Sequence, residues 1–204
     1  MMRTCKNVFP PQIAVLCLLF SPIGRAQGPE SVPVVKIAHE GSTVSFSIKS
    51  SMALAGTFDK WDATLTFTST DVTTGVLDIK IDADSVNTGS GMKNGKLKSK
   101  DFFNAKDDPY ITFHSNKVVQ TSPTTVELPG TFTIRGISKP ETATFTIVGR
   151  GTGEGEIKGT MAFDRKDYDM THGIPPFIRV ADRVEVSINL KAKRVSGPPL
   201  AFKE

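Results

Sequence analysis

The sequence has little cysteine and few aromatic residues other than phenylalanine. Its 204 residues include 2 cysteines, 1 tryptophan and 2 tyrosines, against 13 phenylalanines. The two cysteines, Cys5 and Cys17, can form at most one disulfide, which excludes a fold held by several disulfides. The tryptophan and the tyrosines are not interleaved with basic residues, so we expect no stacking platform for nucleic acid.

Motifs that carry catalysis or bind cofactors are absent as well. The chain contains no Gly-x-Ser-x-Gly nucleophile motif, no phosphate-binding loop and no dinucleotide fingerprint. Its three histidines, His39, His114 and His172, show none of the close spacings of a zinc site. The glycine-rich segment 149–155 precedes a strand pattern and is therefore interpreted as a hairpin. We expect no metal, no cofactor and no catalytic residue.

Long hydrophobic runs are lacking too, and one shorter run lies close to the N-terminus. Residues 13–20 are apolar, far fewer than the roughly 20 residues that span a bilayer. A short basic stretch precedes this run, and the small residues Gly24 and Ala26 follow it at the positions that precede a signal-peptide cleavage site. The pattern predicts a signal peptide, residues 1–26, and a periplasmic or secreted protein.

Cleavage after Ala26 changes the composition of the remaining chain. Both cysteines leave with the leader, and Cys17 follows Leu16 inside the apolar run, which argues against a lipid-modified cysteine. The leader also removes three basic residues and no acid, so the net charge falls from +4 by three to +1. The sequence pI of about 9.1 is therefore no sign of nucleic-acid binding.

From residue 34 onward, apolar and polar residues alternate along the chain. A period of two is typical of β-strands with one buried face and one exposed face. The clearest segments span 44–49, 77–84, 142–147 and 184–193, with shorter ones at 65–67, 111–113, 126–128, 132–134 and 157–163. The single helix candidate spans 90–103, where the apolar stripe is weak.

This pattern predicts an all-β fold, an antiparallel sandwich or barrel. Residues 27–33 are interpreted as a flexible lead-in, 34–195 as one domain, and 196–204 as a tail whose last five residues lie on the surface. Periodicity leaves open whether the phenylalanines of one face fill a core or line a cavity. These phenylalanines are Phe46, Phe58, Phe67, Phe113, Phe132, Phe145 and Phe163.

Several motifs follow one another in a specific order. They include Asp101-Phe-Phe103, Pro109-Tyr-Ile-Thr-Phe-His-Ser115 and Thr133-Ile-Arg-Gly136. In this order and spacing they resemble the YceI-like family of lipid- or polyisoprenoid-binding proteins, over residues 34–195. The resemblance implies an extended, lipocalin-like antiparallel barrel of eight strands that holds a long isoprenoid chain. It also implies export to the periplasm and a role other than catalysis.

The resemblance and the alternation together assign candidate ligand-binding residues. Those expected to line an apolar tunnel are Phe46, Ile48, Phe58, Phe67, Leu77, Ile79, Ile81, Leu97, Phe102, Phe103, Phe113, Phe132, Ile134, Phe145, Phe163, Met170, Val186 and Ile188. Four polar residues are candidates for the mouth of this tunnel: Asn94, Lys96, Arg165 and His172.

The chain departs from the family pattern at several of its polar positions. The family often has a histidine shortly after the first strand, where this chain has residues 49–51, Lys-Ser-Ser. A second family histidine is missing from 93–97, and Tyr168 and Asp169 replace a phenylalanine and a glycine. These changes leave the fold intact and alter the polar end of the pocket, so the head group of the ligand is left open.

We expect the partner to be a long-chain isoprenoid or similar lipid, of the quinone or polyprenyl type, carried or sequestered in the interior. Contact with a membrane is expected to be transient at most, and homodimer formation is left open. The dense lysines of 93–106 are interpreted as a solvated face rather than a rim for anionic head groups.

Two alternatives belong to other functional classes. An exported interaction or stress-protective barrel, with incidental lipid, predicts a large exposed apolar patch. An enzyme acting on a hydrophobic substrate needs an internal polar pair, such as His114 with Asp101 or Arg165 with Asp167.

Overall fold

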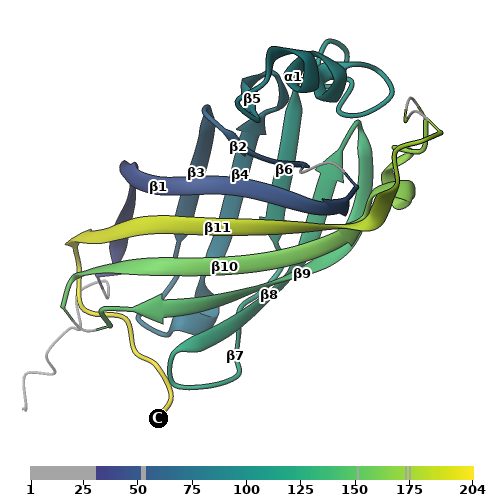
Figure 1. The fold of residues 1–204 in the computed structure, drawn as a ribbon. Helices are drawn as coiled ribbons and strands as arrows, with labels where there is room; N and C mark the ends of the chain where they lie inside the picture. The colour runs from purple at the N-terminus through teal and green to yellow at the C-terminus, as the bar shows by residue number, and fades with distance from the viewer. Residues whose placement is uncertain (1–30, 52–53, 151, 173, 175) are drawn as a thin grey trace, which may run out of the picture. The chain divides into compact units, whose positions relative to one another are not determined.

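A single antiparallel sheet, curled on itself, makes up most of the computed structural model (Figure 1). The structure describes residues 31–204 except 52, 53, 151, 173 and 175. The predicted signal peptide, both cysteines and most of the lead-in lie outside the described residues. No helix among the described residues is long and apolar enough to cross a membrane.

The sheet has eleven strands, in the order β3-β4-β6-β8-β9-β10-β11-β1-β2-β5, with β7 paired to β8. The strands are β1 (Val34–Ser50), β2 (Leu54–Phe58), β3 (Trp61–Thr66), β4 (Val76–Asp82), β5 (Val86–Asn87), β6 (Tyr110–Ser115), β7 (Val119–Gln120), β8 (Thr125–Ile134), β9 (Ile137–Val148), β10 (Glu154–Asp164) and β11 (Val180–Ser196). The helices are η1 (Val72–Thr74), η2 (Ala83–Ser85), α1 (Gly91–Lys98) and η3 (Arg165–Tyr168).

The predicted all-β class is confirmed, whereas the predicted count of eight strands is too low. Two of the eleven strands, β5 and β7, have only two residues each, too few to produce an alternation in the sequence. In the opposite sense, the predicted segments 126–128 and 132–134 belong to one strand, β8, because Pro129 and Gly130 keep their register with β9.

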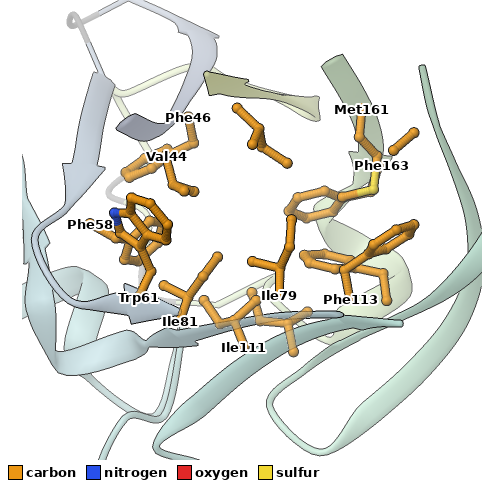
Figure 2. Close-up of a cluster of buried hydrophobic side chains, with 14 of the residues drawn as sticks. Val44, Phe46, Phe58, Trp61, Ile79, Ile81, Ile111, Phe113, Met161 and Phe163 are labelled. Carbon is orange, nitrogen blue, oxygen red and sulfur yellow. The ribbon is translucent and has the colours of Figure 1, made fainter. Parts of the chain in front are cut away.

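The alternating side chains bury their apolar members inside the curl. All seven phenylalanines of the predicted apolar face are buried, with exposed fractions from 1% for Phe145 to 9% for Phe67. Figure 2 shows Val44, Trp61, Ile79 and Phe113 directed from surrounding strands toward a common interior. The prediction that these strands share one buried face is therefore confirmed.

The edge strand β3 approaches the part of β1 that β2 leaves unpaired, without joining it. No backbone ladder pairs β3 with β1 among the described residues, so the barrel is open along this seam. Two aromatic side chains bridge it instead: the ring of His39 on β1 lies 4.4 Å from the ring of Trp61 on β3. The Nε2 atom of His39 also lies 3.8 Å from Oδ1 of Asp62. Side chains thus close the gap that hydrogen bonds leave.

Two hairpins of the sheet have turns whose residues suit the turn geometry or were predicted from the sequence. Arg135 and Gly136, both with positive φ, form the two-residue turn that joins β8 to β9, the geometry that a tight hairpin requires. The glycine-rich segment 149–155 joins β9 to β10, as predicted for a hairpin.

The helix is shorter than its predicted span of 90–103. It spans Gly91–Lys98. Two features disfavour a longer helix: the glycines at 91 and 95, and the absence of a side-chain cap from Ser90. Residues 99–105 continue as turns, which are fixed by backbone hydrogen bonds from Phe103 to Leu97 and from Ala105 to Lys98.

The last five residues were expected to lie on the surface; three of them are exposed, whereas Leu200 and Phe202 are half-buried. Ala201 forms a parallel bridge with Asp71, and its backbone exchanges hydrogen bonds with Thr70 and Val72. Leu200 and Phe202 are consequently half-buried against the end of the sheet. The cause lies in backbone groups of 70–72, which the side-chain pattern of the sequence does not reveal.

Candidate functional site

Two apolar cavities lie inside the curled sheet, at opposite ends of the same strands. The α1-end cavity, of about 70 Å³, is bordered by Val186 of β11 and Phe163 of β10. The tail-end cavity, of about 140 Å³, is bordered by Ala192 of β11 and Ile157 of β10. Both strands therefore contribute residues to each end of the interior, because alternate residues of a strand face the same side.

The α1-end cavity has an almost entirely apolar wall. Seventeen of the eighteen residues that line it are apolar, and the other is Arg165. The wall consists of Val44, Phe46, Ile48, Leu54, Phe58, Ile81, Leu97, Phe102, Phe103, Ile111, Phe132, Ile134, Phe163, Met170, Val180, Val184 and Val186. An apolar wall of this kind binds hydrophobic chains without recognising their chemical details.

Phenylalanine rings form one layer on the α1 side of this cavity. The rings of Phe46 and Phe58 lie 5.6 Å apart, and the ring of Phe103 lies 6.2 Å from Phe46 and 5.7 Å from Phe58. Phe103 comes from the turns that follow α1, so this layer attaches the helical segment to β1 and β2.

A second ring layer attaches η3 to the sheet. The ring of Phe163 lies 5.1 Å from Phe132 and 5.2 Å from Tyr168. Tyr168 is fully buried, and its hydroxyl donates a hydrogen bond of 3.3 Å to Oε1 of Glu141. Burial raises the pKa of the Tyr168 hydroxyl above its ordinary value, and burial also raises the pKa of the Glu141 carboxyl.

Arg165 is the one charged residue of the cavity wall, and its guanidinium is already engaged. Nε donates to the carbonyl of Ala181 at 3.1 Å, Nη1 donates to the carbonyl of Met170, and Nη2 donates to Oδ1 of Asp182 at 2.8 Å. These bonds hold η3, the segment after it and β11 together. The aliphatic stem of Arg165 therefore lines the cavity while its charge is neutralised outside it.

Asp182 carries two cationic partners. Nζ of Lys166 lies 2.6 Å from its Oδ2, on the side away from Arg165. The hydrogen bond from Lys166 and the nearby Arg165 charge lower the pKa of the Asp182 carboxyl, which is therefore ionised at neutral pH. This ion pair explains how Arg165 stays charged with a side chain only 9% exposed.

Arg135 was missed by the sequence reasoning, although it lies in one of the recognised motifs. Its Nη1 donates to the carbonyls of Tyr168 and Asp169, and its Nη2 donates to the carbonyl of Lys100 at 2.9 Å. One side chain thus joins the turns after α1 to η3 across the end of the sheet. The position of an arginine in a hairpin turn could have drawn attention to Arg135. Its partners are backbone carbonyls, however, and no sequence pattern identifies these.

Most of the predicted tunnel residues gather at one end. Twelve of the eighteen line the α1-end cavity: Phe46, Ile48, Phe58, Ile81, Leu97, Phe102, Phe103, Phe132, Ile134, Phe163, Met170 and Val186. Phe67, Leu77 and Phe145 line the tail-end cavity instead. Ile79, Phe113 and Ile188 line neither cavity and lie in the buried core. The five wall residues that the prediction omitted are Val44, Leu54, Ile111, Val180 and Val184.

Of the four predicted mouth residues, only Arg165 lines the cavity. Oδ1 of Asn94 accepts hydrogen bonds from the backbone and hydroxyl of Thr88, so Asn94 fixes the start of α1. Nζ of Lys96 pairs with Asp101 at 2.7 Å. His172 is exposed and bonds to the neighbouring Thr171 at 2.9 Å. Three of the four thus have local structural partners.

The polar pairs that a catalytic alternative requires do not form inside the sheet. His114 lies 2.6 Å from Asp78 on the exposed outer face, and Asp101 is the partner of Lys96. Arg165 pairs with Asp182 rather than with Asp167. In the part of the chain that the structure describes, no group of three histidine, cysteine or acidic residues could hold a metal ion.

Two large apolar side chains stand out on the surface near the α1-end cavity. Met92 of α1 is 88% exposed, and Phe177, in the segment between η3 and β11, is 81% exposed. Met92 is followed by the polar residues Lys93 and Asn94, whereas Phe177 lies between the exposed Pro176 and the half-buried Ile178. Met92 is thus a single exposed apolar residue of a common kind, and Phe177 belongs to a short apolar segment of the surface.

Comparisons with known proteins agree with this geometry. A family model described as the YceI-like domain matches residues 36–192. Protein YceI of Salmonella newport (strain SL254) is 28% identical over 171 residues, which cover 76% of this chain and 84% of its own length.

Solved structures show the same fold at lower identity. BcnA of Burkholderia cenocepacia superposes with a TM-score of 0.69 at 24% identity, over 76% of this chain and 99% of its own. A polyisoprenoid-binding domain from Saccharophagus degradans, implicated in plant cell wall breakdown, superposes with a TM-score of 0.63 at 16% identity, over 79% and 99%. These similarities confirm the predicted lipocalin-like type of barrel.

Proposed function

The chain belongs to the family of YceI-like domains, and on this premise we propose that it is a non-enzymatic binding protein for a long-chain isoprenoid or similar lipid. The observation that carries the proposal is the α1-end cavity, whose wall is apolar except for the stem of Arg165. The structural neighbour described as a polyisoprenoid-binding domain supports the same class of ligand. Quinone-type and polyprenyl lipids both fit this description.

The driving force is the transfer of an apolar chain out of water. Burial of apolar surface contributes about 25 cal/mol per Å², from which the cost of ordering the chain is subtracted. A cavity of about 70 Å³ holds only a few carbon atoms, so a longer chain requires wall residues to move. Met170 and Phe102 suit this role, because methionine adapts its shape readily and Phe102 is only partly buried.

We also propose that the protein is exported and works without a cofactor. The leader-like residues 1–26 support a periplasmic or secreted location. Carriage or sequestration of lipid then takes place outside the cytoplasm, where the protein shields the apolar isoprenoid chain from water. Because the guanidinium of Arg165 is already paired with Asp182, it supports a ligand whose head group needs no cationic partner.

Native mass spectrometry of protein purified from its own host, followed by solvent extraction, tests the proposal. We expect a copurifying lipid, and after its removal we expect decaprenol to raise the melting temperature. Val186→Trp fills the α1-end cavity and should reduce decaprenol affinity by about tenfold or more. Val195→Trp, on the same strand but 47% exposed, is the matched control and should bind as the wild type does.

Circular dichroism establishes that both variants are folded, and Val180→Phe offers a milder filling of the same wall. A host-purified protein without lipid, which is also not stabilised by decaprenol or a quinone, contradicts the proposal. Equal loss of affinity in the Val186→Trp and Val195→Trp variants contradicts the assignment of the site.

A further inference from the structure

The larger of the two cavities plays no part in the function proposed above. The tail-end cavity, of about 140 Å³, is lined mainly by aliphatic side chains. Leu65, Leu77, Val126 and Leu128 belong to its walls, and Phe145 contributes its one fully buried ring. This volume is close to the roughly 150 Å³ of an engineered apolar cavity that stays dry and binds benzene.

A packed layer separates the two cavities along several strands. On β4 the order is Leu77 at the tail-end cavity, Ile79 at neither cavity and Ile81 at the α1-end cavity. On β10 and β11, Met161 and Ile188 occupy the same intermediate position as Ile79. The two spaces are therefore distinct, and a ligand can occupy one without occupying the other.

The last residues of the chain cover the tail-end cavity. We call residues 199–203 the strap, since Pro199, Leu200 and Phe202 line the cavity while the backbone is tied to the sheet. The backbone of Ala201 donates to the carbonyl of Thr70 at 2.8 Å and accepts from Val72 at 3.1 Å. The chain end of the strap is visible at the bottom of Figure 1.

A second attachment holds the far end of the strap. Oε1 of Gln120 accepts from the backbone of Lys203 at 2.8 Å, and its Nε2 donates to the carbonyl of the same residue at 2.7 Å. Gln120 is not one of the residues that line the cavity. The attachment and the cavity wall can therefore be changed separately.

Charged residues at the rim of the tail-end cavity already have partners. Nη1 of Arg150 donates to the carbonyl of Pro123, and its guanidinium lies 5.2 Å from the ring of Phe202. Glu154 pairs with Lys193, and Nη1 of Arg194 donates to the carbonyl of Gly197. A charged ligand gains no new partner from these groups, whereas an uncharged apolar ligand leaves all of these contacts in place.

We propose that the tail-end cavity is a second binding site, for a compact uncharged apolar molecule of about the size of one aromatic ring, and that the strap is its door. The site is independent of the lipid site at the α1 end. Release of the strap from Gln120 and from the backbone of 70–72 removes one wall of the cavity and widens its entrance, without any change in the sheet.

Benzene is the probe, titrated into the full processed protein and followed by amide chemical shifts. Shifts are expected at residues of the tail-end cavity. Ala192→Leu adds bulk to its wall and should weaken benzene binding by about tenfold or more. Gln120→Ala should leave the affinity within about threefold and speed the exchange of benzene, because it loosens the door alone. Val186→Trp, at the other cavity, should bind benzene as the wild type does.

Three results would overturn the proposal: no benzene-induced shifts at the tail end, benzene binding that survives Ala192→Leu, or benzene binding that is lost in Val186→Trp. Ile157→Phe fills the same wall and replaces Ala192→Leu if that variant does not fold. Decaprenol affinity, measured on the same samples, keeps this test separate from the lipid proposal. A protein that binds decaprenol without binding benzene refutes the second site alone.

Discussion

The two ends of the interior are built from the same strands and closed in different ways. At the α1 end, phenylalanine rings and the side chains of Arg135 and Arg165 join η3 and the helical turns to the sheet. At the tail end, aliphatic side chains line the space, and a strap held by backbone bonds and Gln120 covers it. The closure of one end is part of the core, whereas the closure of the other is an attachment to its surface.

This difference separates stability from access. Residues that close the α1 end are buried among other rings, so their removal costs global stability. The strap residues are exposed or half-buried and are held by hydrogen bonds of Ala201 and Lys203, so we expect the strap to detach while the sheet stays folded, as segments of low local stability do. A test of this contrast compares phenylalanines and glycines at the two ends and the half-buried carboxyl of Glu141.

The largest expected effect is a difference between two phenylalanine truncations. Phe163→Ala removes a ring that is 6% exposed and packed against Phe132 and Tyr168, and should reduce the free energy of unfolding by about 3–5 kcal/mol. Phe202→Ala removes a half-buried ring of the strap and should cost about 1 kcal/mol or less, since the strap can detach by itself. Urea denaturation measures both.

The exposed Phe177 supplies the control for this pair. Phe177→Ala should leave the free energy of unfolding within about 0.5 kcal/mol of the wild type. Equal losses for the Phe163 and Phe202 variants would mean that the strap unfolds together with the sheet, and would remove the contrast between the ends.

An intermediate effect is expected at the turn that leads into the strap. Gly197 has a φ of +78°, and a Cβ atom there would lie 2.2 Å from the carbonyl oxygen of Val32. Gly197→Ala should therefore cost about 1–2 kcal/mol, concentrated in the strap. Hydrogen exchange is the measurement: the amides of Ala201 and Lys203 should exchange about tenfold faster, and those of the sheet should change little.

Gly95 of α1 provides the matched substitution, because a methyl group at this position would have no atom within 4 Å and the backbone there is helical. Gly95→Ala should be neutral or stabilise by up to about 1 kcal/mol. Unchanged strap exchange in the Gly197→Ala variant would show that this turn does not control the strap.

The smallest expected effect concerns Glu141, whose pKa burial raises above the ordinary value of 4.5. A raised pKa means that the folded state binds the proton of Glu141 more tightly than the unfolded state does. Protonated Glu141 therefore stabilises the fold below pH 4.5, and this stabilisation is lost as the pH rises through the folded-state pKa. Glu141→Gln removes the charge and retains an acceptor for Tyr168. Its stability relative to the wild type should rise between about pH 4 and about pH 7 by less than about 1 kcal/mol.

Thermal unfolding across this pH range measures the effect, with Glu127→Gln, at an exposed position of β8, as the control. A relative stability of the Glu141→Gln variant that falls as pH rises would contradict the burial of this carboxyl.

Sequence reasoning was most successful where a side chain's position follows from alternation alone. The seven phenylalanines are all buried, and six of them lie in segments of period two, the exception being Phe58. The motifs also identified the family, and most of the predicted tunnel residues lie at the end where those motifs meet.

The missing parts depend on backbone partners far apart in the chain. Arg135 reaches carbonyls of Lys100 and Tyr168, and Ala201 pairs with 70–72. Neither partner is encoded in a local pattern. Asn94 and Lys96 have suitable chemistry for a mouth, but local partners engage them first, and charge in a sequence does not tell how a charge is satisfied.

At the seam between β1 and β3, no backbone ladder fixes the width of the interior of the described chain. Since no ladder joins these strands in the described chain, moving them apart breaks no backbone hydrogen bond between them, and the side-chain contacts that would have to yield include the stack of His39 on Trp61 and the pairing of His39 with Asp62. Separation of these two strands would widen the interior while the ladders between the other neighbouring strands stay intact. If the proposed lipid binds, a thicker chain then disrupts side-chain contacts at this seam rather than a row of backbone hydrogen bonds.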